Sequence, residues 1–388
     1  MPQRRASARR ALILFAALLA VAAVPGAASA KANLQVGFLD NDFAGTYPTQ
    51  FWTEAKQLNV GFMRWDMQWG EMAVSKPADP RNPEDPAYHF AQTDAFVQQA
   101  AAHGLQDKVM FTLWKTPTWA TKAKRAKNAQ MPNLQDWRDF VAACATRYSG
   151  TYVPPGQTTP LPRVVAWETW NEPNGSFAFM PQKAGGKFVS PANYVKLLNA
   201  LKSEVNKAVP FKPVFVAGAL YKQGSPGNPS PIAFMRGMKA AGAKFDVLSV
   251  HPYNNTPRLG IKDGANQSRT NPNFIGVGNM STFITLANQI FGRKYPIWIT
   301  EFGLPTTAPG KTQYAASFKQ QATFAYDAIL RLKALPQVER AAWFLVRDNP
   351  PAPGAWYTTG LQKSGGQNKP SYQSWISASS QLRASTIK

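Results

Sequence analysis

A single-domain (β/α)8 barrel, an α/β fold, is what this sequence predicts, and three observations support it. Eight short apolar runs alternate with eight amphipathic stretches along most of the 388 residues. The apolar runs are nearly continuous, which is typical of parallel strands covered on both faces. No Gly-x-Gly-x-x-Gly turn follows the first run, as one would in many open doubly wound sheets. Strict alternation of strand and helix over this length therefore favours the closed barrel.

The expected elements follow one another without a repeat or a linker. The apolar runs predict strands at residues 34–39, 60–65, 108–114, 163–170, 213–220, 245–251, 296–301 and 341–346. Apolar residues at helical spacing predict helices at about 48–58, 88–103, 134–148, 191–208, 231–242, 280–292, 312–334 and 370–382. Pro191 and Pro231 suit a first helical turn, and Gly104 and Gly150 suit helix ends.

Loop lengths indicate which end of the barrel carries a site. Four long connections follow strands, and they are residues 70–88, 115–133, 254–278 and 347–370. Residues 150–163 are the exception, because they precede the fourth strand. Since barrel enzymes place their sites at the carboxyl ends of the strands, we expect the site among the four long loops.

The first thirty residues predict a secretory signal peptide. Four arginines precede the apolar residues 11–24, and Ala28-Ser29-Ala30 gives a small-residue cleavage pattern. We expect cleavage after Ala30, a catalytic domain at 31–388, and a secreted, periplasmic or cell-envelope location. An uncleaved anchor is the alternative, although the run is short for a span. No later run is long enough, so no membrane insertion is expected after cleavage.

The composition of the chain indicates which disulfides, ligands and binding partners to expect. Cys144 is the single cysteine, which excludes an internal disulfide and predicts a small apolar residue in a core helix. The net charge of +22 favours acidic partners such as anionic polysaccharides. The basic residues are scattered and match no nucleic-acid motif, so no nucleic acid is expected. No metal-ligand spacing or phosphate loop predicts a metal or cofactor, and we expect a monomer.

Carboxylates end two of the expected strands. In "VVAWETWNEPNG", Glu168, Trp170 and Glu172 alternate, so we expect all three to point the same way, with Glu172 at the carboxyl end. Glu301 ends the seventh strand in "IWITEFG". The fourth and seventh strands stand across a barrel from each other. Two opposed carboxylates are what a glycosidase needs.

The strand-four segment resembles a known family. Asn171-Glu172-Pro173 after strand four, with a glutamate ending strand seven, resembles the clan A glycoside hydrolases, and "WETWNEPN" is similar to the motif of family 39. Family 5 is also similar. The resemblance implies a retaining glycosidase with Glu172 as acid/base and Glu301 as nucleophile.

Other matches extend the resemblance over nearly the whole chain after residue 30. Arg64 matches an arginine that ends strand two, and "LWKTPTWA", which contains Trp119, resembles a strand-three motif. His251 and Tyr253 match the strand-six His-x-Tyr pattern, and Trp343 matches a strand-eight tryptophan. The resemblance implies that the substrate-binding residues are Arg64, Asn171, His251, Tyr253, Trp343 and Trp119.

General chemistry suggests a role for each of these side chains. An apolar surrounding would keep Glu172 protonated, and a nearby cation such as Arg64 would keep Glu301 ionised. Asn171 could donate to a sugar 2-hydroxyl and Tyr253 to Glu301, while Trp343 offers a flat surface for a sugar ring. Alternatively, Arg64 is structural and pairs with a buried Glu168, and His251 is a structural hydrogen-bond donor.

Two other functions fit the same barrel. A transglycosylase would use the same chemistry, and a non-catalytic glycan-binding envelope protein would use the same fold. The substrate is a poly- or oligosaccharide. Residues 115–127 carry five basic and no acidic side chains, and with Trp114 and Trp119 they would suit an anionic glycan. A solvated loop far from a neutral glycan is the alternative.

Overall fold

The computed structural model describes residues 34–382 except 126, 255–272, 307–314 and 351–356. The predicted signal peptide at 1–30 lies outside the described residues, as do parts of the long loops 254–278 and 347–370. Within the described residues, no helix is both long and apolar enough to cross a membrane.

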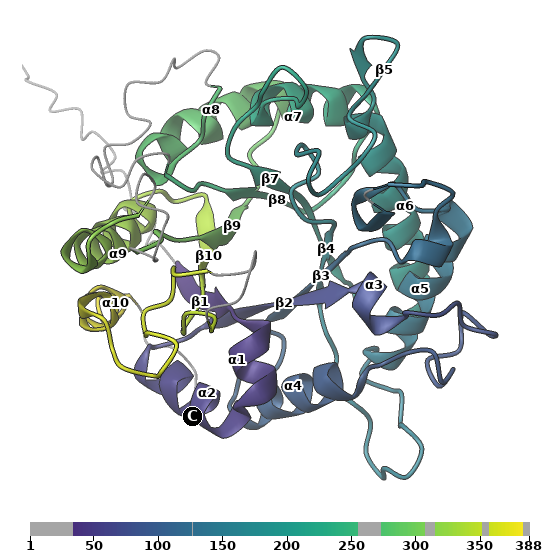
Figure 1. The fold of residues 1–388 in the computed structure, drawn as a ribbon, viewed down its shortest axis with the longest axis horizontal. Helices are drawn as coiled ribbons and strands as arrows, with labels where there is room; N and C mark the ends of the chain where they lie inside the picture. Colours follow the sequence, from purple (N-terminus) through teal and green to yellow (C-terminus); the bar gives the residue numbers. More distant parts are fainter. Residues whose placement is uncertain (1–33, 126, 255–272, 307–314, 351–356, 383–388) are drawn as a thin grey trace, which may run out of the picture. The chain divides into compact units, whose positions relative to one another are not determined.

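Eight parallel strands close into a barrel, in the order β1-β10-β9-β8-β7-β4-β3-β2 (Figure 1). Their bounds are β1 Gln35–Leu39, β2 Phe62–Gln68, β3 Val109–Trp114, β4 Ala166–Thr169, β7 Val214–Tyr221, β8 Val247–His251, β9 Ile297–Phe302 and β10 Val338–Phe344. The predicted (β/α)8 fold is confirmed. The last strand begins three residues before the predicted 341, because the charged pair Glu339-Arg340 interrupts its apolar pattern.

The expected helices surround the strands (Figure 1). They are α2 Pro48–Gln57, α4 Ala91–Ala102, α5 Leu134–Arg147, α6 Ser190–Ala208, α7 Pro231–Ala240, α8 Met280–Phe291, α9 Phe318–Lys333 and α10 Pro370–Ser379. Cys144 is buried on α5, as expected. Short elements were not predicted: α1 Asn41–Thr46, α3 Trp69–Met72 and the hairpin of β5 Lys183–Ala184 and β6 Lys187–Phe188. They are too short to give a periodic pattern.

The barrel interior has an apolar layer with a polar layer above it. The apolar layer consists of Phe62, Met110, Ala166, Val216, Val247, Trp298 and Ala342. Two residues further along five of these strands come Arg64, Thr112, Glu168, Ser249 and Thr300, none of which is exposed. Since alternate residues of a strand face the same side, all five point inward. A larger apolar core fills the space between strands and helices. The polar layer therefore forms the floor of whatever lies at the carboxyl ends.

Close contact between β1 and β2 depends on Gly37. It pairs with Phe62, and a β-carbon at Gly37 would lie 1.6 Å from the Phe62 carbonyl oxygen. Any side chain there would push the two strands apart beneath Arg64.

We predict that Gly37→Ala lowers the free energy of unfolding by about 3 kcal/mol, the upper part of the usual cost of overpacking. The matched control is Gly227→Ala, where an added methyl meets nothing within 4 Å. Urea unfolding followed by tryptophan fluorescence measures both. Equal unfolding midpoints for the two variants would contradict the steric argument.

Candidate active site

Arg64 is the centre of the polar layer. Its guanidinium donates to Asn171 Oδ1 at 2.7 Å, to Thr112 Oγ1 at 2.9 Å and to Glu301 Oε2 at 3.1 Å. It also pairs with Asp66 at 3.0 Å and with Glu168 at 3.7 Å. The sequence placed Arg64 at the end of its strand, but it is the third residue of β2. It therefore lies inside the barrel, where one side chain reaches several strands.

Glu301 points inward because β9 is irregular. Ile299 pairs with Ala341 and Phe302 with Trp343, so two residues of β9, Thr300 and Glu301, stand against one of β10. Ile299 and Phe302 both face the outer core. A β-bulge of this kind redirects a side chain. Here it brings Glu301 to the same face as Thr300.

Glu172 lies three residues after β4, in a turn with unusual backbone. Trp170 has φ of 63° and Glu172 of 46°, a left-handed conformation that is uncommon outside glycine. The turn is held to β7 because the Glu172 N–H donates to Ala219 O at 3.0 Å. The prediction that Glu168, Trp170 and Glu172 point the same way is wrong for Trp170. Its left-handed backbone turns the ring outward, 5.7 Å from Trp137 of α5.

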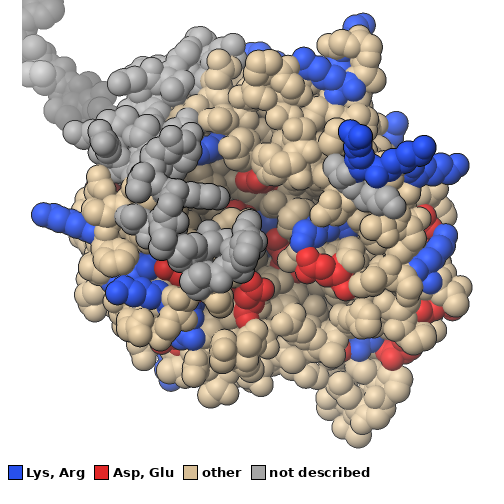
Figure 2. Space-filling model, in the orientation of Figure 1, with Lys and Arg blue, Asp and Glu red and all other residues tan. Residues whose placement is uncertain are grey.

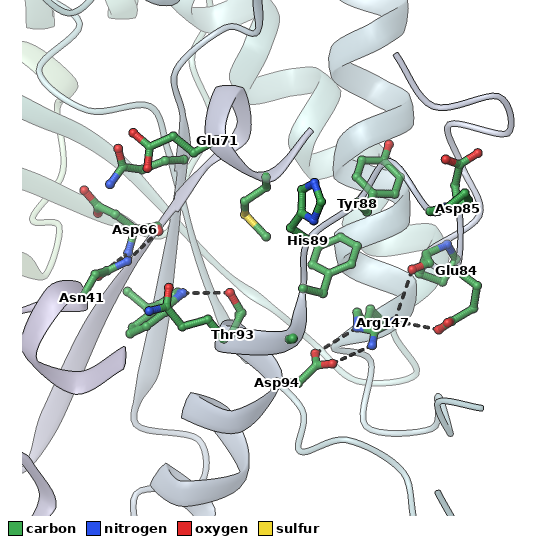
Figure 3. Close-up of a pocket in the computed structure, with 18 of the residues that line it drawn as sticks. Asn41, Asp66, Glu71, Glu84, Asp85, Tyr88, His89, Thr93, Asp94 and Arg147 are labelled. Carbon is green, nitrogen blue, oxygen red and sulfur yellow. Dashed lines mark hydrogen bonds and ion pairs between the residues drawn. The ribbon is translucent and has the colours of Figure 1, made fainter. Parts of the chain in front are cut away.

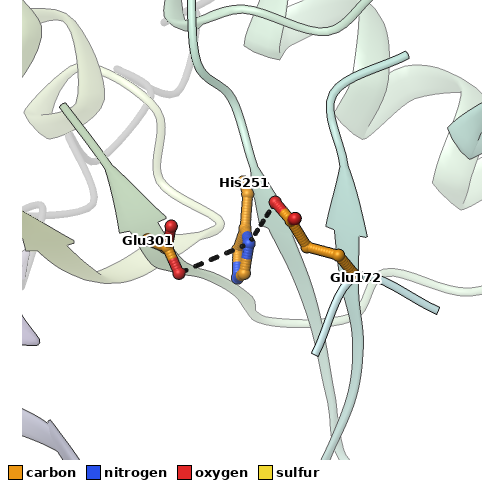
Figure 4. Close-up of side chains that lie close together, drawn as sticks. All are labelled: Glu172, His251 and Glu301. Atoms are coloured by element: carbon orange, nitrogen blue, oxygen red, sulfur yellow. Dashed lines mark hydrogen bonds and ion pairs between the residues drawn. The ribbon is translucent and has the colours of Figure 1, made fainter. Parts of the chain in front are cut away.

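The two carboxyl groups meet beside His251 (Figure 4). His251 Nδ1 lies 3.0 Å from Glu172 Oε1 and 3.8 Å from Glu301 Oε2, and one ligand-type atom from each residue lies within 4.8 Å of the others. Such a group could hold a metal by distance alone. The Arg64 guanidinium is, however, 3.1 Å from both His251 and Glu301, and its charge opposes a cation there.

The surroundings make the two carboxyl groups unequal. Burial and then the charge of Glu301 raise the pKa of Glu172 well above its ordinary value. Burial also raises the pKa of Glu301, but Arg64 and a hydrogen bond from Tyr253 oppose that rise. Tyr253 donates to Glu301 Oε1 at 2.7 Å. A single shared proton therefore favours Glu172, and Glu301 is the carboxylate.

His251 is neutral and oriented. Burial, and then the charge of Arg64, lower the pKa of His251 well below its ordinary value. Arg64 can only donate, so its contact with His251 Nε2 at 3.1 Å makes that nitrogen the acceptor. The ring proton then lies on Nδ1 and is directed at Glu172. This arrangement matches the structural hydrogen-bond donor that the sequence left open.

Asn171 has one polar group to spare. Its Oδ1 accepts from Arg64, and its side chain is largely buried. Its Nδ2 has no hydrogen-bond partner among the residues that the structure describes. Because the oxygen is occupied, the group directed away from Arg64 is a donor, which is what a sugar hydroxyl oxygen requires.

Comparison with known proteins identifies the family of the chain. Residues 169–365 match the family model described as glycosyl hydrolase catalytic core, a span of more than half of the 388 residues. The chain belongs to the glycosyl hydrolase catalytic core family. The matched span contains Glu172, His251 and Glu301. No curated protein matches the sequence.

Solved structures share the fold of this glycosyl hydrolase at low identity. A family 39 glycoside hydrolase from Bacteroides cellulosilyticus WH2 has a TM-score of 0.61 and 19% identity, covering 92% of this chain and 65% of that chain. A monomeric β-xylosidase from Caulobacter crescentus CB15 has a TM-score of 0.59 and 16% identity, covering 89% and 67%. Xylanase 10B from Thermotoga maritima has a TM-score of 0.55 and 15% identity, covering 91% and 97%. The chain thus spans about two thirds of the first two proteins.

Trp343 does not lie in the site of this glycosyl hydrolase, contrary to the sequence prediction. It has no exposed surface, faces the outer core against Phe302 and Trp375, and donates through Nε1 to Thr359 O. The next residue, Phe344, alternates with the inward Ala342 and takes the inward position at the end of β10. Strand alternation could have distinguished the two residues, had the register been known.

Trp119 and the basic loop lie beside α3. Trp119 donates to Ala73 O at 2.8 Å and stands edge-on to Trp69; no contact links it to the carboxyl pair among the described residues. Lys115 pairs with Glu71. Lys122, Lys124 and Arg125 are exposed, and the side chain of Lys127 lies outside the described residues. The structure thus leaves three basic side chains of this loop facing solvent.

Acidic side chains, with some basic ones beside them, lie around the hollow at the centre of the face shown in Figure 2. A cavity of about 600 Å³ adjoins the site through Asp66 and is lined also by Glu84 and Asp94 (Figure 3). These acids already have partners: Asp66 pairs with Arg64, and Arg147 pairs with Glu84 at 2.7 Å and with Asp94 at 2.6 Å. The cavity therefore adjoins the site, and these three acidic side chains on its wall are already paired with arginines.

The raised pKa of Glu172 predicts how stability changes with pH. A carboxyl group that holds its proton more tightly when folded favours the folded state below its unfolded pKa, about 4.5. That contribution is lost as pH rises through the folded pKa, by up to about 1.4 kcal/mol per pH unit. Glu172→Gln removes it, so stability should fall less steeply above pH 4.5.

Urea unfolding between pH 4.5 and 7.5 measures this slope. Glu71→Gln is the control, because its carboxyl is exposed and pairs with Lys115 outside the carboxyl pair. If Glu172→Gln shows the same slope as the parent protein, Glu172 is not protonated preferentially in the folded state.

Proposed function

We propose that this protein is an exported, retaining glycoside hydrolase that cleaves O-glycosidic bonds of a poly- or oligosaccharide by double displacement. The observation that carries the proposal is the short distance between the two carboxyl groups, which place oxygens within 4.8 Å of each other. Retaining enzymes hold their carboxyl groups about 5–5.5 Å apart, whereas inverting enzymes need about 6.5–9.5 Å to admit a water. Export rests on the signal-like residues 1–30.

In the first step, Glu301 attacks the anomeric carbon while Glu172 gives its proton to the departing oxygen. A covalent glycosyl-enzyme ester forms, and the leaving sugar departs as an alcohol. Arg64 and Tyr253 support this role because they stabilise the charge of Glu301 before attack. Burial supports the protonated state of Glu172.

In the second step, Glu172 is a carboxylate and takes a proton from water, which attacks the same carbon and releases Glu301. The Nδ1–H of His251, 3.0 Å from Glu172, would stabilise the carboxylate in this half of the cycle. Two inversions give net retention. If a sugar hydroxyl replaces water, the same site performs transglycosylation, which is the second candidate activity.

We expect Glu301→Gln to abolish turnover on every substrate, because no nucleophile remains. Glu172→Gln should lower kcat on a disaccharide by about 10²–10⁴, the usual contribution of a general acid. It should lower the formation of the covalent intermediate from a 2,4-dinitrophenyl glycoside far less, since that leaving group needs little protonation. Stopped-flow release of dinitrophenol separates these steps.

Glu71→Gln is the matched control, since Glu71 is an exposed carboxylate of α3 that pairs with Lys115. NMR of the first-formed product measures the anomeric configuration. An inverted product, or a Glu172→Gln variant that is equally slow on both substrates, would overturn the assignment.

An anionic glycan is the second candidate substrate, favoured by the exposed Lys122, Lys124 and Arg125. Reversal of all three to glutamate should then raise KM for an anionic polysaccharide more than for a neutral one. The salt dependence of the parent protein should also flatten, because the Debye length falls from about 10 Å at 0.1 M to about 3 Å at 1 M.

The control reverses three exposed lysines on the outer side of the barrel, Lys56, Lys196 and Lys212. It makes the same change in net charge without altering the loop. If both triple variants change KM equally, only the net charge matters and the loop has no part in substrate choice.

A further inference from the structure

Two exposed aromatic side chains stand at the mouth of the barrel in the same arrangement. Tyr357 is 53% exposed, and its ring lies 5.0 Å from that of Phe344 at an interplanar angle of 79°. Phe177 is 59% exposed, and its ring lies 5.2 Å from that of Tyr221 at 80°. Each is therefore an exposed ring set edge-on against an aromatic residue that ends a strand.

The two supporting residues lie on opposite sides of the carboxyl pair. Phe344 ends β10, the strand that neighbours β9 and Glu301. Tyr221 ends β7 and pairs in register with His251, the residue that contacts Glu172. Residues paired in a parallel sheet face the same side, so Tyr221, like His251, is directed toward the mouth. Tyr357 thus belongs to the Glu301 side and Phe177 to the Glu172 side.

Both rings are carried on well-bonded backbone. The residue after Tyr357 is Thr358, which exchanges hydrogen bonds with Thr306 and accepts from the buried ammonium of Lys369 at 3.1 Å. Lys369 also binds Asp348 at 2.8 Å. Phe344 and this network hold Tyr357 in place from two directions.

The Phe177 loop is bonded equally well. Asn174 receives the Tyr221 N–H at 2.7 Å and donates to the Tyr221 carbonyl at 3.0 Å, and the Ser176 N–H donates to Asn228 at 3.0 Å. The turn that carries Glu172 and the ring of Phe177 are therefore parts of one anchored segment.

We propose that Tyr357 and Phe177 are the stacking surfaces of two sugar subsites, one on each side of the bond that is cleaved. Sugar rings have apolar C–H faces that pack on aromatic side chains. In a retaining reaction the nucleophile faces the sugar that stays on the enzyme, and the acid faces the departing sugar. Tyr357 then holds the retained sugar and Phe177 the leaving one. This inference rests on the proposed function.

Electrostatics agree with the place of Tyr357. Burial, followed by the charges of Glu301 and Glu172, raises the pKa of the Tyr357 hydroxyl. The charges of both carboxyl groups therefore act on the Tyr357 hydroxyl.

The experiment compares two substrates of the same sugar, either xylose or glucose, whichever the parent protein cleaves faster. One is the β-1,4-linked hexasaccharide, and the other is the glycosyl fluoride, whose leaving group is no sugar. Phe177→Ala should lower kcat/KM for the hexasaccharide about two- to tenfold relative to the fluoride. Tyr357→Ala should lower kcat/KM for both by a similar factor, and Tyr357→Phe, which keeps the ring, should restore most of it.

Phe188→Ala is the matched control, because Phe188 is an exposed aromatic on the β5–β6 hairpin, away from the strand ends (Figure 1). Melting temperatures of all variants test folding. A Phe177→Ala variant that matches Phe188→Ala on both substrates, or a Tyr357→Ala variant that does so, overturns this inference. Activity that survives Glu301→Gln overturns the proposed function instead.

Discussion

The buried guanidinium of Arg64 is the interaction on which the site depends. Its partners come from β2, β3 and β9 and from the turn after β4, so it joins strands that are distant in sequence. Burial alone would leave Glu168 and Glu301 protonated or mutually repelling, and one cation offsets both costs. Removing that charge would leave several buried carboxyl groups uncompensated. The sequence left open whether Arg64 is a structural partner of Glu168 or belongs to the site. The structure is compatible with both.

The same charge acts unequally on the two carboxyl groups. Arg64 contacts Glu301 directly, whereas Glu172 faces the neutral ring of His251. Burial raises the pKa of both groups, and the direct contact with Arg64 and the hydrogen bond from Tyr253 oppose that rise at Glu301. The strained turn at Trp170 and Glu172 sets the position of the Glu172 carboxyl group, because a regular continuation of the strand would direct it elsewhere.

Much of the fold and of the carboxyl pair could be predicted because both follow from periodicity. Eight apolar runs and eight helical patterns gave the barrel, and glutamates at two strand ends gave Glu172 and Glu301. The errors arose where the backbone departs from regular alternation. Trp170, which was expected to point inward, turns outward through positive φ. Glu301 does point inward, as expected, but through a β-bulge that the sequence does not show. Trp343 was assigned to the site because it matches a strand-eight tryptophan of the family that the sequence resembles. A difference of one residue reverses the face of a strand, and the sequence does not reveal which face is inward.

The last helix, α10, is linked through Lys369 to the backbone next to Tyr357. Lys369 immediately precedes α10, and α10 packs against α9 on the outside of the barrel. The ammonium of Lys369 nevertheless donates to Thr306, Asp348 and Thr358. A shift of α10 would move this ammonium, and with it the backbone next to Tyr357. Substitutions in the contact between the two outer helices, far from any sugar, are therefore a route by which such a barrel could acquire a different preference for its substrate while its carboxyl pair stays unchanged.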